Sequence, residues 1–393
     1  MGDFPWFFDY FIKSCEHNPT IDFYIFCNTS YDGEIPENVS LLNLTLDEFN
    51  LIASSKLKLT VSIEDAYKLC DFKPAYGVIF SEYLIGYDFW GVCDLDIVFG
   101  QIREFMTESL LSEYDVISGR PDFPTGYFML FRNEKEVNYL FTKSRDYKMI
   151  FGSQKHYCFD ECNFKHDYLT DGYSIFDISC EIESMHHVLI KEKNNIRVFW
   201  DFLIIEGLPG NLKWVNGQLV FMERYETLLY HFKLFKNNIL TKKKNSKAIP
   251  KKFKIYRYHI QNYSYNLFKI SYNYLKYEIF NPYYHFLSQR IDYYISVGLN
   301  RRNHNQCSSD SEFSDGKIFL RKSEGKYTFL AYNKEFRGQR LIIPSIFKTN
   351  TFYVREKSFT TYIISHFSEH KINFRTIDIA GFSYKFQLKK TLV

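Results

Sequence analysis

Short apolar runs alternate with amphipathic segments along the first part of the chain. Four short, mostly apolar segments have the length of strands: residues 21–27, 89–93, 115–118 and 126–132. Three other segments repeat their apolar positions at helical spacing: residues 46–54, residues 64–70 after the cap candidate Ser62, and residues 102–111. This alternation predicts an α/β fold with helices on both faces of a sheet and a ligand crevice at the carboxyl ends of its strands.

The pattern changes near residue 240. Residues 237–246 are polar and Pro250 follows them, which predicts a linker. Beyond it, residues 253–299 are dense in Tyr, Phe and Lys at helix-compatible spacing, and short β-like segments alternate with turns from residue 317 onward. We expect three parts: an α/β domain over 1–240, a basic aromatic helical segment over 241–300, and a small β-rich region over 301–393.

The net charge of +3 conceals two oppositely charged halves. Residues 1–226 hold 36 acidic and 19 basic side chains, whereas residues 227–393 hold 10 acidic and 30 basic ones. The share of hydrophobic residues, 46%, is that of a globular protein and excludes wholesale disorder. No apolar run reaches the roughly 18–20 residues of a membrane span, and the N-terminus lacks a secretory pattern. We therefore expect a soluble or peripheral protein of the cytoplasm.

Eight cysteines are scattered along the chain without the rhythm of a disulfide scaffold. Cys158 and Cys162 are separated by three residues, but no second close Cys/His pair completes a zinc pattern. The cysteines are therefore interpreted as reduced and mostly buried thiols.

Two carboxylates follow the apolar run 89–93. Asp94 and Asp96 are two positions apart, and residues at that spacing point to the same side of an extended backbone. Both can therefore face one ion, and hard oxygen ligands of this kind suit Mg²⁺ or Mn²⁺. Such an ion would neutralise a departing diphosphate. A solvated strand end is the alternative interpretation of the same D-x-D spacing.

Several motifs resemble, in order, those of a bacterial family of uncharacterised, glycosyltransferase-like domains of polysaccharide biosynthesis: residues 14–22, 71–77, 94–96, 156–162, 205–210 and 229–231. The chain is more distantly similar to clostridial glucosylating toxins and Golgi initiating mannosyltransferases. The resemblance covers roughly residues 4–236. It implies a GT-A-like, Rossmann-related domain that moves a sugar from a nucleoside-diphosphate donor, expected to be a UDP-sugar, to capsule, lipopolysaccharide or a lipid-linked saccharide.

The same resemblance implies roles for individual residues. Asp94 and Asp96 would bind the metal and the diphosphate, with His231 as a third metal ligand. The donor sugar or nucleotide would contact Asp71, Lys73 and Tyr76, and Gly126 would let the backbone approach the sugar closely. On the acceptor side, Asp160 and Glu161 would act as general base or stabilising carboxylate. Without the resemblance, Asp71 and Lys73 are an ordinary helical pair, and Asp160 and Glu161 an acidic pair at a helix N-terminus.

Relatives place a strand and turn before the segment that matches residues 4–7, and we expect this chain to lack that strand. Because such a strand helps to bind the nucleotide base in GT-A folds, a catalytically inactive binding or scaffold protein is the alternative to an enzyme.

Three interpretations of the basic, aromatic segment 242–276 stay open. It could lie on an anionic membrane at the inner face of the plasma membrane, through lysines and interfacial aromatics. It could instead pack on the acidic domain as a solvated helical face. Nucleic-acid binding through phosphates and stacking is the least favoured of the three.

Overall fold

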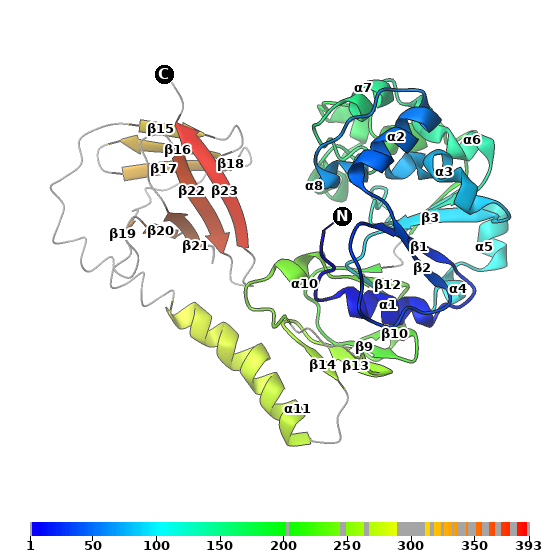
Figure 1. Cartoon of the computed structure of the whole chain (residues 1–393). Helices are drawn as coiled ribbons and strands as arrows, with labels where there is room; N and C mark the ends of the chain where they lie inside the picture. Colours follow the sequence, from blue (N-terminus) through cyan, green and yellow to red (C-terminus); the bar gives the residue numbers. More distant parts are fainter. Residues whose placement is uncertain are drawn as a thin grey trace. The chain divides into compact units, whose positions relative to one another are not determined.

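The computed structural model describes residues 2–201, 204–243, 249–262 and 267–288, with strand segments between 311 and 390. These residues form two compact units (Figure 1). The N-terminal unit comprises Met1–Gly207, Asn211–Phe232 and Lys244–Lys254. The division is therefore not a single point near residue 240. After residues 233–243 the chain returns to the first unit, where the ring of Phe253 stacks on Trp214 with 5.0 Å between centroids.

A four-stranded sheet organises the N-terminal unit. Its strand order is β3 (Phe89–Cys93), β6 (Phe128–Arg132), β5 (Val116–Ser118) and β7 (Val198–Trp200). β6 runs antiparallel to β3 and β5, whereas β7 is parallel to β5. The predicted strands at 89–93, 115–118 and 126–132 are thereby confirmed, and the fold is mixed α/β.

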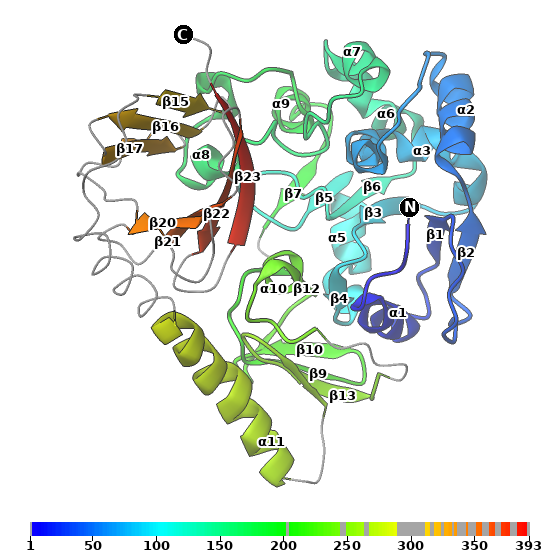
Figure 2. The ribbon, with the colours of Figure 1, turned by 60° about the vertical axis from the view of Figure 1, so that its left-hand side comes forward.

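Helices cover both faces of this sheet, as the sequence predicts (Figure 2). Along β5 and β6 alternate residues enter different cores, because neighbouring side chains of a strand point to opposite faces. Val116 belongs to a core with helices α2 (Leu46–Leu57), α7 (Tyr147–Gly152) and α9 (Met185–Lys191). Ile117 belongs to a second core with helices α1 (Phe8–Glu16) and α4 (Ile102–Phe105).

Smaller sheets complete the unit. β1 (Phe23–Cys27) pairs in parallel with β2 (Val39–Asn43), and both β1 and β3 line one apolar cavity of about 420 Å³. A three-stranded sheet has the order β4 (Ile97–Phe99), β12 (Leu229–His231), β8 (Ile204–Ile205). In a further sheet, four strands are hydrogen-bonded neighbours in the order β11 (Tyr225–Glu226), β10 (Gln218–Phe221), β9 (Leu212–Val215), β13 (Lys252–Ile255).

The capping residues decide where the observed helices begin and end, and two of the three predicted helices differ from the prediction. α2 begins as expected, with a capping box between Thr45 and Glu48. The segment predicted as a helix over 64–70 is a 3₁₀ helix, Ala66–Ala75, capped by Asp65 instead of Ser62, and Pro74 lies inside it. The segment predicted over 102–111 is divided into α4 and α5 (Glu108–Glu113), because the Thr107 side chain accepts from Leu110 N and starts a new helix.

The remaining short helices of the N-terminal unit are α3 (Tyr76–Ile79), α6 (Lys135–Asn138), α8 (His166–Thr170) and the 3₁₀ helices Ser81–Leu84, Leu140–Lys143 and Ile175–Asp177.

The second unit does not open with the helix predicted from residue 253. It contains α10 (Lys233–Asn237), strand β14 (Ile260–Asn262) and then α11 (Leu267–Tyr274), which continues through the π-helical turn Leu275–Phe280 to residue 288. Residues 289–300 of the predicted helix lie outside the described residues. Nowhere in the described ranges is a helix both long and apolar enough to cross a bilayer.

The strand segments beyond residue 310 form a nine-stranded antiparallel sheet in the order β18-β17-β16-β15-β23-β22-β21-β20-β19. Their bounds are β15 (Ser311–Ser314), β16 (Ile318–Ser323), β17 (Lys326–Ala331), β18 (Lys334–Glu335), β19 (Ile343–Pro344), β20 (Thr351–Arg355), β21 (Thr361–Ser365), β22 (Lys371–Ile377) and β23 (Ser383–Lys390).

Candidate functional site

Asp94, Asp96 and His231 lie together, with one ligand atom from each within 4.8 Å of the others. The two aspartates occupy the bend between β3 and β4, not an extended strand. β12 pairs antiparallel with β4 so that His231 is opposite Ile97, the residue that follows Asp96. The Phe232 amide also donates to Asp96 O at 2.7 Å, which fixes the end of β12 beside the bend. Strand pairing thus brings together residues that are far apart in the sequence.

His231 is held between two carboxylates. Its Nε2 lies 3.3 Å from Asp96 Oδ2 and its Nδ1 lies 3.4 Å from Glu206 Oε1. Burial alone would lower the pKa of His231, but these contacts outweigh burial and raise it to about 9. Arg120 donates to the same Glu206 at 2.6 Å, and Tyr127 stacks on the imidazole with 4.1 Å between centroids. The orientation of His231 is therefore fixed by its surroundings.

Lys73 connects this cluster to a second carboxylate. Its ammonium donates to Asp94 Oδ1 at 2.5 Å and to the Gly126 carbonyl at 2.7 Å, and lies 3.9 Å from Asp160 Oδ2. Burial opposes the charge, but the carboxylates of Asp94 and Asp160 outweigh it and raise the pKa of Lys73 well above its usual value. The structure thus brings together four of the predicted site residues, Lys73, Asp94, Gly126 and Asp160.

The Asp160 side chain is buried, and its Oδ1 has no hydrogen-bond partner among the described residues. Burial raises the pKa of Asp160 well above its ordinary value, although Lys73 acts in the opposite direction. Gly126 packs against this carboxylate so closely that a Cβ at residue 126 would overlap Asp160 Oδ2. Any side chain at position 126 would therefore displace the Asp160 carboxylate.

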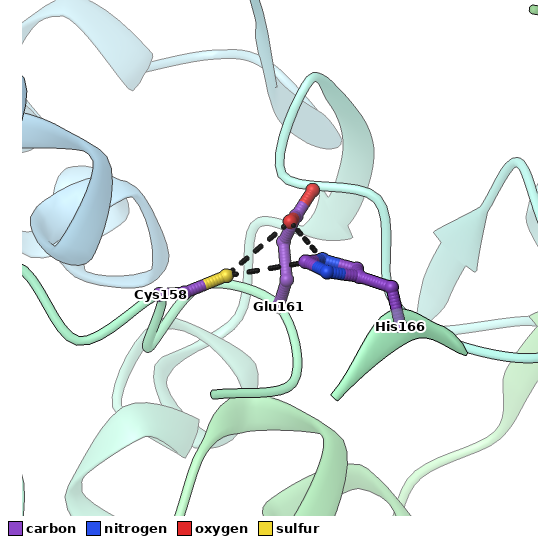
Figure 3. A group of neighbouring side chains, drawn as sticks. All are labelled: Cys158, Glu161 and His166. Carbon is purple, nitrogen blue, oxygen red and sulfur yellow. Dashed lines mark hydrogen bonds and ion pairs between the residues drawn. The ribbon is translucent and has the colours of Figure 1, made fainter. Parts of the chain in front are cut away.

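Glu161 faces a different set of partners. Its Oε1 accepts from Gly126 N at 2.9 Å, while its Oε2 lies 2.7 Å from His166 Nε2 and 3.4 Å from Cys158 Sγ (Figure 3). Glu161 and Asp160 are adjacent but are not equivalent, because only Asp160 approaches Lys73. Neither begins a helix, so the alternative of a helix N-terminal pair does not apply.

Asp71 and Tyr76 contact other parts of the protein. Asp71 is fully buried and accepts from Lys68 Nζ and from the amides of Tyr157 and Phe159, all within 2.9 Å. It fixes the segment that carries Asp160 and cannot reach a ligand in this conformation. The Tyr76 hydroxyl donates to Leu69 O, and its ring lines the apolar cavity beside β1 and β3, to which Lys73 also contributes.

Three residues of the site were not singled out from the sequence: Glu206, Arg120 and His166. Glu206 lies inside the motif 205–210, so its acidic side chain was a usable signal. Arg120 and His166 join the site only through tertiary packing, and nothing in their local sequence marks them.

The cluster offers two carboxylates and an imidazole, a donor set that suits Mn²⁺ or Mg²⁺. The Asp94 side chain is 37% exposed, whereas those of Asp96 and His231 are below 10%, so a ligand could approach from the Asp94 side. The N-terminal unit is thus a mixed α/β domain with a candidate metal cluster next to a buried lysine.

The chain belongs to a family described as a family of unknown function (DUF6625), which matches residues 1–264. A search of curated proteins finds no match to the chain, and a search of solved structures finds none either.

Proposed function

We propose that the chain is a metal-dependent glycosyltransferase with a GT-A-like domain, which moves a sugar from a nucleoside-diphosphate donor, most simply a UDP-sugar, to a bacterial surface polysaccharide or lipid-linked saccharide. The observation that carries the proposal is the convergence of Asp94, Asp96 and His231 with the ammonium of Lys73. A lysine ammonium and a metal ion held by carboxylates together can stabilise the negative charge of a departing diphosphate.

In this proposal, Asp94, Asp96 and His231 would hold Mn²⁺ or Mg²⁺, and His231 would release its extra ring proton to solvent on binding. The ion would stabilise charge on the diphosphate. Glu206 and Tyr127 keep the imidazole of His231 in place. Lys73 supplies a fixed positive charge on the same side as Asp94.

Asp160 faces the transferred sugar in this proposal, with Oδ1 free to accept from a hydroxyl group. Gly126 leaves the room for that carboxylate. Glu161 is excluded from the reacting position because its two oxygens are engaged by Gly126 N, His166 and Cys158.

The test is calorimetric titration with UDP, GDP and CMP, each with and without Mn²⁺, followed by sugar-transfer assays with the nucleotide that binds. We expect one nucleotide to bind only with the metal, and Asp96→Asn to abolish that binding. Asp47→Asn, which removes an exposed carboxylate on α2, is the matched control. Metal-dependent binding without transfer to any acceptor would leave a binding or scaffold protein, and full transfer by Asp96→Asn would refute the proposal.

We further propose that the basic aromatic segment contacts an anionic membrane surface. In the described part of 242–276, Phe268 is 91% exposed and Tyr272 61%. Lys269 lies beside them on α11, and Lys276 lies in the π-helical turn that follows. Exposed aromatics beside lysines suit the interface of anionic lipid. Vesicles with anionic lipid should sediment the protein, and Phe268→Ser/Tyr272→Ser should weaken this. Equal sedimentation of the wild type and the double variant would contradict the membrane contact.

A further inference from the structure

A second group of potential ligands lies in the loop 158–166, apart from the aspartate cluster. Cys158, Glu161 and His166 each offer one ligand atom, and these atoms lie within 4.8 Å of one another. Figure 3 shows the three side chains directed toward a common point, two from the loop and one from the start of α8. We propose that this group binds a zinc ion through Cys158 Sγ, a Glu161 carboxylate oxygen and His166 Nε2.

The distances fit a tetrahedral metal. Zinc bonds of about 2.3 Å to sulfur and about 2.0–2.2 Å to nitrogen and oxygen place ligand atoms about 3.4–3.6 Å apart. In the structure Sγ lies 3.4 Å from Glu161 Oε2 and 3.9 Å from His166 Nε2, and the last two atoms are 2.7 Å apart. Opening the Glu161–His166 contact by about 0.7 Å brings the three ligand atoms to tetrahedral spacing.

The donor set selects the class of metal. Thiolate is a soft ligand and imidazole a borderline one, so the group favours Zn²⁺ over the Mg²⁺ or Mn²⁺ expected at the aspartate cluster. One thiolate and one carboxylate neutralise the two charges of the ion. On binding, the S–H bond of Cys158 breaks, its proton passes to solvent and the S–Zn bond forms. Three protein ligands leave a fourth position for water, and the His166 side chain, 31% exposed, gives access to it.

The loop is held in shape before any metal binds. Cys158, Asn163 and Phe164 have positive φ angles of 54°, 52° and 60°, a conformation that residues with a Cβ seldom adopt. Asn163 N donates to Cys158 O and Asn163 Nδ2 to Tyr157 O, both at 3.0 Å. Asp71 holds the backbone on both sides of Cys158, because it accepts from the amides of Tyr157 and Phe159. The loop therefore presents Cys158 next to Glu161 and His166 on a backbone that its own hydrogen bonds already hold.

Metal content and cobalt substitution of the full chain test the proposal directly. After incubation with zinc and removal of free metal, the protein should retain about one zinc per chain. Replacement by Co²⁺ should give a thiolate-to-cobalt charge-transfer band in the near ultraviolet. Wild-type protein that retains no zinc and shows no such band would overturn the proposal.

Variants assign the ligands. Cys158→Ser should abolish the band, whereas Cys162→Ser, which changes another buried cysteine of the same loop, should keep it. His166→Gln, at a partly exposed position, should weaken zinc binding by at least about 100-fold, because even the loss of an outer partner commonly weakens binding 10–100-fold. A band that persists in Cys158→Ser would also overturn the proposal.

The outcome is separable from the proposed transferase function. Asp96→Asn should keep its zinc while losing Mn²⁺-dependent nucleotide binding. Wild-type protein that retains zinc but binds no nucleotide would support the zinc site and reject the transferase function. Wild-type protein that binds a nucleotide with Mn²⁺ but retains no zinc would support the transferase function and reject the zinc site.

Discussion

Asp71 offers the sharpest test of how the site is held. Its carboxylate is fully buried, pairs with the buried ammonium of Lys68 at 2.7 Å and accepts from the Tyr157 and Phe159 amides. Asp71→Asn leaves the Lys68 charge without its partner in a water-poor environment. Removing one member of a buried ion pair destabilises a protein by about 3–5 kcal/mol. That is a large part of a typical unfolding free energy of about 5–15 kcal/mol.

The pH dependence of this effect has a definite sign. Burial would raise the pKa of Asp71, but the neighbouring His156, Lys68 and Phe159 amide together hold it below its ordinary value. A group with a lowered folded pKa stabilises the protein above its unfolded pKa, about 3.9, and loses that effect as the pH falls through the folded value. The difference in unfolding free energy between the wild type and Asp71→Asn should therefore be constant near neutral pH and shrink below about pH 4.

The assay is equilibrium urea unfolding followed by tryptophan fluorescence. It reports on the N-terminal unit because all four tryptophans lie there: Trp6, Trp90, Trp200 and Trp214. The double variant Lys68→Met/Asp71→Asn should recover about 1–3 kcal/mol of the loss, since both charges are then gone. Glu181→Gln breaks an exposed pair with Lys155 and should change stability by less than about 1 kcal/mol. A loss below about 1 kcal/mol for Asp71→Asn at pH 7, or one that does not change with acid, would refute the reasoning.

Two further predictions concern the site itself. Gly126→Ala should displace the Asp160 carboxylate and lower sugar transfer by at least about 100-fold, with nucleotide binding retained. Gly152→Ala, where an added Cβ meets only one atom at 4.0 Å, should leave transfer unchanged, and equal rates for the two variants would contradict the steric argument. Glu206→Gln should weaken Mn²⁺ binding about 10–100-fold because His231 loses an orienting partner. Calorimetry measures this, and unchanged affinity would show that His231 is positioned without Glu206.

The strands were predictable because burial of both faces makes them continuous apolar runs. β3 and β6 coincide with or lie within the predicted segments, since their alternating residues fill two separate cores. Helix ends were less predictable, because they depend on which nearby side chain accepts from the first free amides. Ser62 and Asp65 are both reasonable caps by sequence, and only tertiary packing selects Asp65.

Some residues of the candidate site could also be recognised from the local sequence, whereas others are placed only by the tertiary structure. Asp94 and Asp96 were visible as a local spacing, although the structure places them in a bend. His231 could be placed only through a resemblance, since its position depends on the pairing of β12 with β4 across more than a hundred residues. The loop 158–166 has no periodic pattern, so the approach of His166 to Cys158 could not be derived from the sequence.

Gly126 connects the two candidate metal groups through its own backbone. Its amide donates to Glu161, which lies in the cysteine group, and its carbonyl accepts from Lys73, which contacts Asp94. Glu161 and Lys73 therefore contact two successive peptide groups, the 125–126 amide and the 126–127 carbonyl, on either side of the Gly126 Cα. A metal bound by Glu161 would restrain the Gly126 backbone from one side, while Lys73 restrains it from the other. The two proposed metal sites would therefore share the backbone at Gly126 as a common support.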